Sequence, residues 1–367
     1  MEVSATSAAG RSVVAHIFSE FEENRFHTAY VTNSESNSVS AFGIGDRGAL
    51  SVVQDPVVGC GDDPRAIVAA PDGRTVYVSD TGANHISAYR VGTGGTLSCL
   101  GTQIPTGGDD PFGLAVAPDG RWLYVADIAS NAVSVFTLRP DGIPAMPKVY
   151  ASGATSPRGI AVHPDGRFVY VSHGRPMPDT EPGRLTVLAV QQDGSLRLLS
   201  RKPIEIGLSG AMIAIPRNGR FLYVGAQRSD EIHGFRIESD GTLTPVPHSP
   251  FRAPGFPEGV AATPDGRFVY AAGQKDGAGG IHGFAVDRYG SLTPVPHSPF
   301  KPGTSQVGIA ITSDGRHLYT SGDDSTPTAE SSIYGFAIDQ SGALHEVPHS
   351  PLATGGDAPA FQSVAII

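Results

Sequence analysis

The chain has 367 residues, of which 40% are hydrophobic, and a formal net charge of −10. Its 26 Lys and Arg residues are scattered, which argues against binding to nucleic acid or to a bare anionic membrane, because both need clustered basic residues. No segment approaches the roughly 18 consecutive apolar residues of a membrane-spanning helix.

Residues 1–23 lack a basic segment followed by a long apolar stretch, so they do not resemble a signal peptide. We expect a short N-terminal arm here and a cytoplasmic protein.

From residue 24 onward, one motif recurs: a hydrophobic run, a Pro-Asp-Gly-Arg turn, and a second run that ends in a Tyr-Val pair. A degenerate copy lies at 24–33, and further copies lie at 66–80, 113–127, 159–173, 212–226, 259–273 and 308–322. The anchor tyrosines, spaced 46 to 53 residues apart, are Tyr30, Tyr77, Tyr124, Tyr170, Tyr223, Tyr270 and Tyr319. Seven copies at this period predict a propeller or a solenoid.

Each copy contains four short runs with strand character, which in the second copy are 65–70, 75–80, 85–91 and 96–104. The Pro-Asp-Gly and Asp-Gly dipeptides between the runs are hairpin signals. Four antiparallel strands per copy are typical of a propeller blade. We therefore predict an all-β, seven-bladed β-propeller that forms a single domain over 24–367.

The C-terminal sequence GGDAPAFQSVAII resembles the start of a repeat, such as GGDDPFGLAVA at 107–117, and the first copy lacks such a strand. The C-terminal strand is therefore expected to join the N-terminal blade and close the ring, which removes two exposed sheet edges.

The chain has one Trp and no Trp-Asp dipeptide, and its Gly-Gly pairs fall at different repeat positions. The Tyr-Val-Thr-Asn sequence at 30–33, the Pro-Asp-Gly-Arg anchors and the Asp-Gly-x-Leu segments at 193–196 and 240–243 resemble the YVTN-repeat, lactonase-like propeller family. The resemblance covers nearly all of 24–367. It implies an enzyme that opens or closes a lactone, because relatives include 6-phosphogluconolactonase and carboxymuconate-cyclising enzymes.

Propeller topology places the variable loops on one face, where the first residue of each innermost strand lies at the mouth of the central channel. By register with the turns, these residues are Arg65, Phe112, Arg158, Gly210, Glu258, Val307 and Gln362, and Asp63 and Asp110 lie close by. Guanidinium, carboxylate and amide groups in one pocket suit a small anionic or oxygen-rich molecule. Alternatively, the two arginines form structural ion pairs with Asp63, Asp110 or Glu258.

The resemblance implies Arg, His and Glu at the catalytic site, so the catalytic candidates are Arg158, Glu258 as general base, and His173 as the nearest histidine. The substrate-binding candidates are Arg65, Asp63, Asp110, Phe112 and Gln362. Two long loops, 173–184 and 321–332, are expected to stand above the mouth.

Other motifs favour structural roles. His248, His297 and His349 recur in a Val-Pro-His-Ser-Pro connection, but equivalent positions of different blades lie too far apart to share a metal ion. Cys60 and Cys99 are expected to be buried, unpaired thiols. The sequence contains no HExxH, P-loop, GxGxxG or GxSxG motif, so no metal and no cofactor are expected.

Two functional hypotheses stay open. The first is an enzyme for lactone hydrolysis, lactonising cyclisation or isomerisation, and the second is a non-catalytic propeller that binds a small ligand or a protein. We expect a monomer whose partner is a small molecule. The substrate and the direction of the reaction stay open.

Overall fold

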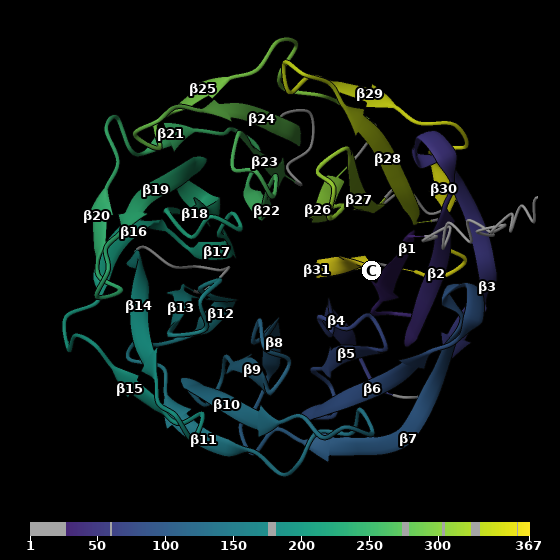
Figure 1. Ribbon diagram of the computed structural model, residues 1–367, viewed down its shortest axis with the longest axis horizontal. Helices are drawn as coiled ribbons and strands as arrows, with labels where there is room; N and C mark the ends of the chain where they lie inside the picture. The colour runs from purple at the N-terminus through teal and green to yellow at the C-terminus, as the bar shows by residue number, and fades with distance from the viewer. Residues whose placement is uncertain are drawn as a thin grey trace, which may run out of the picture.

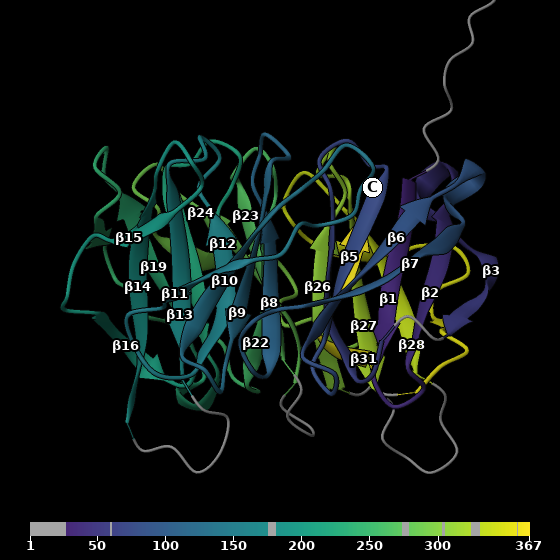
Figure 2. The ribbon, with the colours of Figure 1, turned by 90° about the horizontal axis from the view of Figure 1, so that it is seen from below.

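The computed structural model describes residues 27–58, 61–174, 181–273, 279–302, 305–323, 331–357 and 359–367. Seven antiparallel sheets surround a common axis, which Figure 1 views end-on and Figure 2 views from the side. The predicted all-β, seven-bladed propeller is thus confirmed. The described part also contains three short 3-10 turns, η1 (Asp46–Gly48), η2 (Thr93–Gly95) and η3 (Gln227–Ser229), and none of its helices is long and apolar enough to cross a membrane. The arm at 1–23 lies outside the described residues.

Each blade is named by its order in the chain, and its strands follow from the innermost outward. Blade 1 contains β31 (Pro359–Ile366), β1 (His27–Asn33), β2 (Ser38–Ile44) and β3 (Leu50–Val58). Blade 2 contains β4 (Pro64–Ala69), β5 (Thr75–Asp80), β6 (His85–Val91) and β7 (Leu97–Pro105). Blade 3 contains β8 (Pro111–Val116), β9 (Trp122–Asp127), β10 (Ala132–Thr137) and β11 (Lys148–Ala151). Blade 4 contains β12 (Pro157–Val162), β13 (Phe168–His173), β14 (Pro182–Val190), β15 (Leu196–Leu198) and β16 (Ile204–Leu208).

The last three blades repeat this plan, although their outer strands are shorter. Blade 5 contains β17 (Gly210–Ala214), β18 (Phe221–Ala226), β19 (Glu231–Ile237), β20 (Leu243–Pro245) and β21 (Phe251–Arg252). Blade 6 contains β22 (Pro257–Ala262), β23 (Phe268–Gly273), β24 (Gly280–Val286) and β25 (Leu292–Pro294). Blade 7 contains β26 (Ser305–Ile311), β27 (His317–Asp323), β28 (Ser332–Ile338), β29 (Leu344–Glu346) and β30 (Leu352–Ala353).

The ring is closed by the C-terminal strand, as the sequence predicts. Figure 1 shows the yellow β31 beside the purple β1. The two strands are antiparallel, with Tyr30 opposite Ala365 and Val31 opposite Val364. Blade 1 is therefore built from both ends of the described chain, and β31 lies at the axis where an unpaired strand edge would otherwise remain.

The anchor tyrosines join neighbouring blades. In six blades the buried hydroxyl donates to the carbonyl of a glycine in the outer hairpin of the next blade, for example from Tyr223 to Gly290 at 2.9 Å and from Tyr319 to Gly48 at 2.8 Å. The glycine is required in that hairpin, because Gly290 has a φ of +87° and an added Cβ would lie 2.5 Å from the Phe221 ring. The anchor tyrosine of one repeat thus binds the hairpin glycine of the next repeat.

The innermost strands approach one another closely around the axis. A Cβ added at Gly259 would lie 2.5 Å from the Val307 carbonyl oxygen of the next blade. In blades 2 to 7 the pairing between the innermost strand and its neighbour shifts register after the first or second residue of the innermost strand, for example between Pro257 and Gly259. Such irregularities interrupt the alternation of side chains between the two faces of the sheet. Here they change the direction of the side chains at the channel mouth.

In several blades, polar side chains of the second and third strands bind each other or the connection that enters the blade. In blade 3, Ser134 donates to the Asp127 carboxylate and to the Thr106 carbonyl, both at 2.6 Å. The equivalent positions lie on the second strand and on the third strand, two residues beyond the register partner of the first. In blades 1 to 7 they are Asn33 and Ser40, Asp80 and Ser87, Asp127 and Ser134, His173 and Thr186, Ala226 and His233, Gly273 and His282, and Gly322 and Tyr334. We call these the lock pairs. Their large member moves from the second strand in blades 1 to 4 to the third strand in blades 5 to 7.

Two lock pairs contain a buried carboxylate. Asp80 and Asp127 are fully buried, and burial raises the pKa of each to about 7. The nearby Asp109 carboxylate raises the pKa of Asp127 further, while the Ser134 hydroxyl lowers it. Blade 1 has the neutral Asn33 at the same position, where its Nδ2 donates to Ser40 at 2.8 Å. The lock therefore tolerates an amide.

The prediction of an unpaired, buried thiol is wrong for Cys99, which is disulfide-bonded and exposed on β7. Sequence spacing did not indicate this, because two cysteines far apart in the chain carry no local pairing signal. Cys60, the other cysteine of the chain, lies outside the described residues. His248, His297 and His349 lie exposed on the outer connections of separate blades, at positive φ.

Replacing Tyr223 by Phe should lower the free energy of unfolding by about 1 to 2 kcal/mol, because the buried Gly290 carbonyl loses its donor. Tyr124 provides a matched control, since its buried hydroxyl has no hydrogen-bond partner among the described residues. Tyr124→Phe should therefore leave stability unchanged or raise it. Urea unfolding of both variants measures the difference, and equal losses would contradict the role of the inter-blade hydrogen bond.

Deleting residues 360–367 should abolish the folded monomer, because β1 then loses its inner partner and two sheet edges are exposed. Size-exclusion chromatography and circular dichroism measure the result. A truncated protein that stays monomeric with the melting temperature of the intact chain would contradict closure by β31.

Asp127→Asn should stabilise the fold at pH 8 and have little effect near pH 4. The pKa of Asp127 is raised on folding, so the folded state loses stability as pH rises from the unfolded pKa through about 7. The gain at pH 8 is at most about 4 kcal/mol, from 1.36 kcal/mol per pKa unit. Urea unfolding at both pH values tests this, with Asp141→Asn, which alters an exposed carboxylate of lowered pKa, as the control.

Candidate functional site

The candidate site lies where the innermost strands begin, at the mouth of the channel. In five successive blades, the residue directly before the innermost strand adopts a positive φ. These residues are Asp63, Asp110, Ser156, Ser209 and Phe256. Side chains other than Gly adopt this conformation at a cost, and such positions concentrate at functional sites. This geometry directs the mouth residues of several blades towards the axis.

A buried ion pair connects blades 4 and 6. The Arg158 Nη2 lies 2.8 Å from the Glu258 Oε1, and the two side chains are 1% and 0% exposed. The pair passes over blade 5, whose mouth residue Gly210 has no side chain. Gln227, at the start of η3, accepts a long hydrogen bond of 3.4 Å from Arg158 Nη1. The Arg158 guanidinium also lies over the Phe112 ring, 5.2 Å from its centroid.

Glu258 has the properties of a titrating acid or base. Burial raises its pKa, and this effect outweighs the lowering by the Arg158 charge. Its second oxygen, Oε2, is buried and has no hydrogen-bond partner among the described residues. A buried carboxylate with one oxygen available and a raised pKa can accept a proton from water or from a substrate hydroxyl.

The second half of the mouth, from blades 2 and 3, is more accessible. Arg65 contacts Asp63 through two nitrogen–oxygen pairs, both at 2.9 Å, and each side chain is 32% exposed. Burial raises the pKa of Asp110, the Arg65 charge lowers it, and the Asp63 charge raises it further. This half presents two carboxylates and one guanidinium.

The connections that carry these residues are held rigidly. The Oδ1 of Asn37 accepts the Asp63 N–H, and the Oδ1 of Asn84 accepts the Asp110 N–H, both at 2.8 Å. Each asparagine belongs to the preceding blade and itself adopts a positive φ, so each blade orients the mouth residues of the next.

The connection that carries Glu258 is held from two blades. Asp230 Oδ1 accepts the N–H groups of residues 255 and 256, both at 3.0 Å. His282, from the blade 6 lock pair, lies with its Nε2 2.7 Å from the Pro254 carbonyl and donates to it. Burial lowers the pKa of His282, which keeps it neutral at pH 7.

His173 and Gln362 are engaged within the fold. His173 lies opposite Pro157, next to Arg158, and its Nε2 lies 2.8 Å from the Thr186 Oγ1. Burial lowers its pKa to about 4, so the ring is neutral at pH 7. Gln362 bridges blades 1 and 3: its Nε2 donates to the Leu114 carbonyl at 2.8 Å, and its Oε1 accepts the Leu114 N–H at 3.2 Å.

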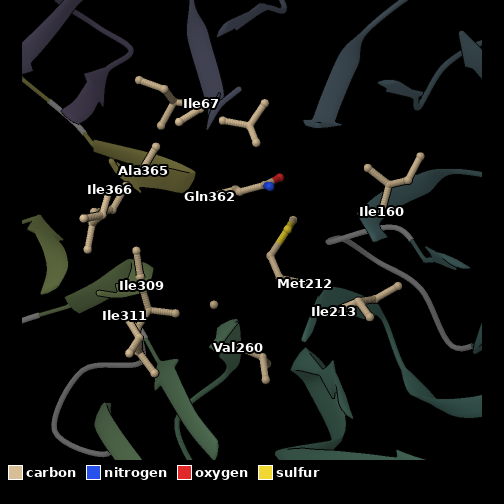
Figure 3. A pocket seen from close by; sticks show the side chains of 15 residues that line it. Ile67, Ile160, Met212, Ile213, Val260, Ile309, Ile311, Gln362, Ala365 and Ile366 are labelled. Atoms are coloured by element: carbon tan, nitrogen blue, oxygen red, sulfur yellow. The ribbon is translucent and has the colours of Figure 1, made fainter. Parts of the chain in front are cut away.

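Beyond Gln362, the channel contains a cavity of about 310 Å³. Figure 3 shows Gln362 from β31 and Met212 from β17 pointing into it, among Ile and Val side chains. The innermost strands are partly exposed at their far ends, as at Val68 and Ile311, while Phe112 and Val307 are buried at the mouth. The cavity is therefore more accessible from the face of the Pro-Asp-Gly-Arg turns than from the mouth.

The structure brings Arg158, Glu258 and Phe112 together, and separately Asp63, Arg65 and Asp110. The sequence analysis did not identify Gln227, Asp230 or His282 as site residues. The only sequence signal for them is their place in the repeat: Gln227 and Asp230 follow the second strand of blade 5, and His282 lies in the third strand of blade 6. Parts of the two long loops, 175–180 and 324–330, lie outside the described residues. Within the described ranges, no group of three or more His, Cys, Asp or Glu is placed to hold a metal ion.

The comparisons with solved structures agree with this fold. A proposed 6-phosphogluconolactonase from Bacteroides uniformis is 22% identical, with a TM-score of 0.76, covering 93% of this chain and 99% of the other. A similar protein from Bacteroides fragilis is 20% identical, with a TM-score of 0.75 and 94% and 99% coverage. The periplasmic gluconolactonase of Pseudomonas aeruginosa is 21% identical, with a TM-score of 0.72 and 93% and 99% coverage. Identities this low support the fold alone.

Among curated proteins, none matches the chain. The family model described as a seven-bladed β-propeller lactonase matches residues 18–142, 139–246 and 207–307, which together span most of the chain. The repeat, the ring closure and this match lead to one conclusion: the chain belongs to the lactonase family of seven-bladed β-propellers.

Proposed function

We propose that the protein hydrolyses a small, oxygen-rich lactone at the mouth of the channel. The observation that carries this proposal is the buried Arg158–Glu258 pair at 2.8 Å, whose Glu258 Oε2 has no hydrogen-bond partner among the described residues. The family and the names of the solved neighbours support a lactone substrate. Lactonising cyclisation would use the same groups in the reverse reaction, and isomerisation would use them in a different order.

In this mechanism Glu258 takes a proton from water, and the water oxygen attacks the lactone carbonyl. The carbonyl oxygen becomes an oxyanion, which the Arg158 guanidinium stabilises by charge and hydrogen bonding. The ring C–O bond then breaks, and the leaving alkoxide takes the proton back from Glu258. The product is a hydroxy acid, and the sequence of steps needs no cofactor.

The remaining candidates contribute binding or positioning. Arg65, Asp63 and Asp110 would hold the substrate in the accessible half of the mouth, and Phe112 would support the Arg158 guanidinium from below. His173 would help to position the strand that carries Arg158, because its neutral ring is hydrogen-bonded to Thr186. Gln362 would define the floor of the site by holding Leu114.

A second candidate function is non-catalytic binding of a small ligand or a protein. The observation that favours it is the burial of both Arg158 and Glu258, with side chains 1% and 0% exposed. A pair this enclosed also suits a purely structural role. Measured turnover separates the two functions.

The disulfide bond of Cys99 indicates the cellular compartment in which the protein is located. Disulfides persist in oxidising compartments and are rare in the cytosol. This bond and the periplasmic neighbour support an oxidising compartment in place of the cytoplasm that the N-terminal sequence indicated. A thiol count on protein taken directly from fractionated cells tests this.

Glu258→Gln should reduce lactone turnover about 10²- to 10⁴-fold, because the variant lacks the general base. It should also destabilise the fold by about 3 to 5 kcal/mol, since the Arg158 charge is left buried without its partner. The double variant Arg158→Met with Glu258→Gln removes both charges and should recover much of the stability without recovering turnover.

Turnover is measured by pH-stat against a panel of γ- and δ-lactones, corrected for spontaneous hydrolysis, and stability by thermal melting. Glu205→Gln, which breaks the exposed Arg184–Glu205 pair at 3.4 Å, is the control and should change neither. If the double variant turns over lactone at the wild-type rate, the catalytic assignment is wrong. A wild-type protein that opens none of these lactones would favour the binding function.

A further inference from the structure

The mouth of the channel has an excess of negative charge. The Arg158 charge is balanced by Glu258 at 2.8 Å, and the Arg65 charge is balanced by Asp63 at 2.9 Å. Asp110 adds a further carboxylate beside Arg65. Each guanidinium of this cluster is therefore neutralised within it, and one acidic group is left in excess.

The surrounding loops extend this charge. On the described part of the mouth face, four acidic residues are exposed on the connections between blades and on the loops after the second strands: Glu35, Asp62, Asp109 and Asp357. The opposite face is balanced, because its turns pair Asp with Arg, as in Asp265 with Arg267 at 2.6 Å. The mouth face is thus more acidic than the opposite face over the described residues.

The accessible half of the mouth is also rich in hydrogen-bond acceptors held in fixed positions. Asn37 and Asn84 hold the backbone of Asp63 and Asp110, so these carboxylates need little reorganisation to bind a ligand. Ionised carboxylates only accept hydrogen bonds, and hydroxyl groups are donors that match them. A phosphate or carboxylate group on the ligand would instead meet like charge.

We propose that the substrate is an uncharged lactone carrying several hydroxyl groups, rather than a phosphorylated or carboxylated one. This inference rests on the proposed lactone hydrolysis. Asp63 and Asp110 accept hydrogen bonds from ring or side-chain hydroxyls and place the lactone carbonyl near Arg158 and Glu258. The acidic loops exclude phosphate esters of the same lactone, because their dianionic group is repelled on approach.

The test compares D-glucono-1,5-lactone with its 6-phosphate and with δ-valerolactone, which is uncharged but has no hydroxyls. At low salt, kcat/KM for gluconolactone should exceed that for the phosphate ester by about tenfold or more, and the gap should narrow in 0.5 M NaCl. Valerolactone should be the poorer of the two neutral substrates. A phosphate ester that equals or exceeds gluconolactone at low salt would overturn the inference.

Asp63→Asn and Asp110→Asn test the residues directly, and both keep a side chain that tolerates positive φ. Each should lower kcat/KM for gluconolactone and raise it for the phosphate ester, most clearly in Asp63→Asn, which releases the Arg65 charge. Asp119→Asn makes the same charge change on the opposite face, beside Arg121, and should leave the preference unchanged. The same effect in all three variants would show that overall charge alone sets the preference and would overturn the role of Asp63 and Asp110.

Binding of the non-hydrolysable gluconolactam and of its 6-phosphate, followed by NMR, separates this inference from the proposed reaction. If no lactone is hydrolysed but the neutral lactam binds about tenfold more tightly than its phosphate, catalysis fails and the charge preference stands. If lactones are hydrolysed and the phosphorylated lactam binds more tightly, the reaction stands and the charge preference is overturned. Binding of neither lactam would also overturn it.

Discussion

The ring depends on the hydrogen bonds that six of the seven anchor tyrosines donate to a glycine carbonyl of the next blade. A propeller blade cannot stand alone, because both faces of its sheet are apolar and must be covered by its neighbours. The tyrosine ring fills the interface while its hydroxyl satisfies the buried turn, and the glycine gives the turn its left-handed backbone. The bond from Tyr319 to Gly48 joins blade 7 to blade 1, so the same interaction acts across the closure made by β31.

The seven blades are not equivalent at the lock pairs. Blades 1 to 4 place the larger polar side chain on the second strand, and blades 5 to 7 place it on the third strand, where His282 holds the connection that carries Glu258. The exchange changes which groups contact the connection. The buried carboxylates of Asp80 and Asp127 give blades 2 and 3 a dependence on pH that blade 1, with Asn33, lacks.

The two ends of the channel differ in chemistry. At the mouth, Arg158 and Glu258 are enclosed and neutralise each other, while Asp63, Arg65 and Asp110 are more accessible. Gln362 crosses the channel to Leu114 and separates this polar mouth from the cavity that opens towards the other face. The mouth is thus polar, and exposed acidic residues lie on the loops around it.

The sequence by itself determined the architecture, because its signals are local. Turn dipeptides and hydrophobic runs repeat seven times, and the incomplete first copy with its C-terminal complement predicts the ring closure. The same register placed Arg158 and Glu258 at the mouth. Only the tertiary structure decided that these two residues form a buried ion pair beside Gln227. It also decided that Gln362 forms hydrogen bonds with the Leu114 backbone and that Cys99 is disulfide-bonded. Each of these contacts joins residues that are far apart in the chain. Spacing along the sequence carries no signal for such contacts, because they depend on how the blades are arranged around the axis.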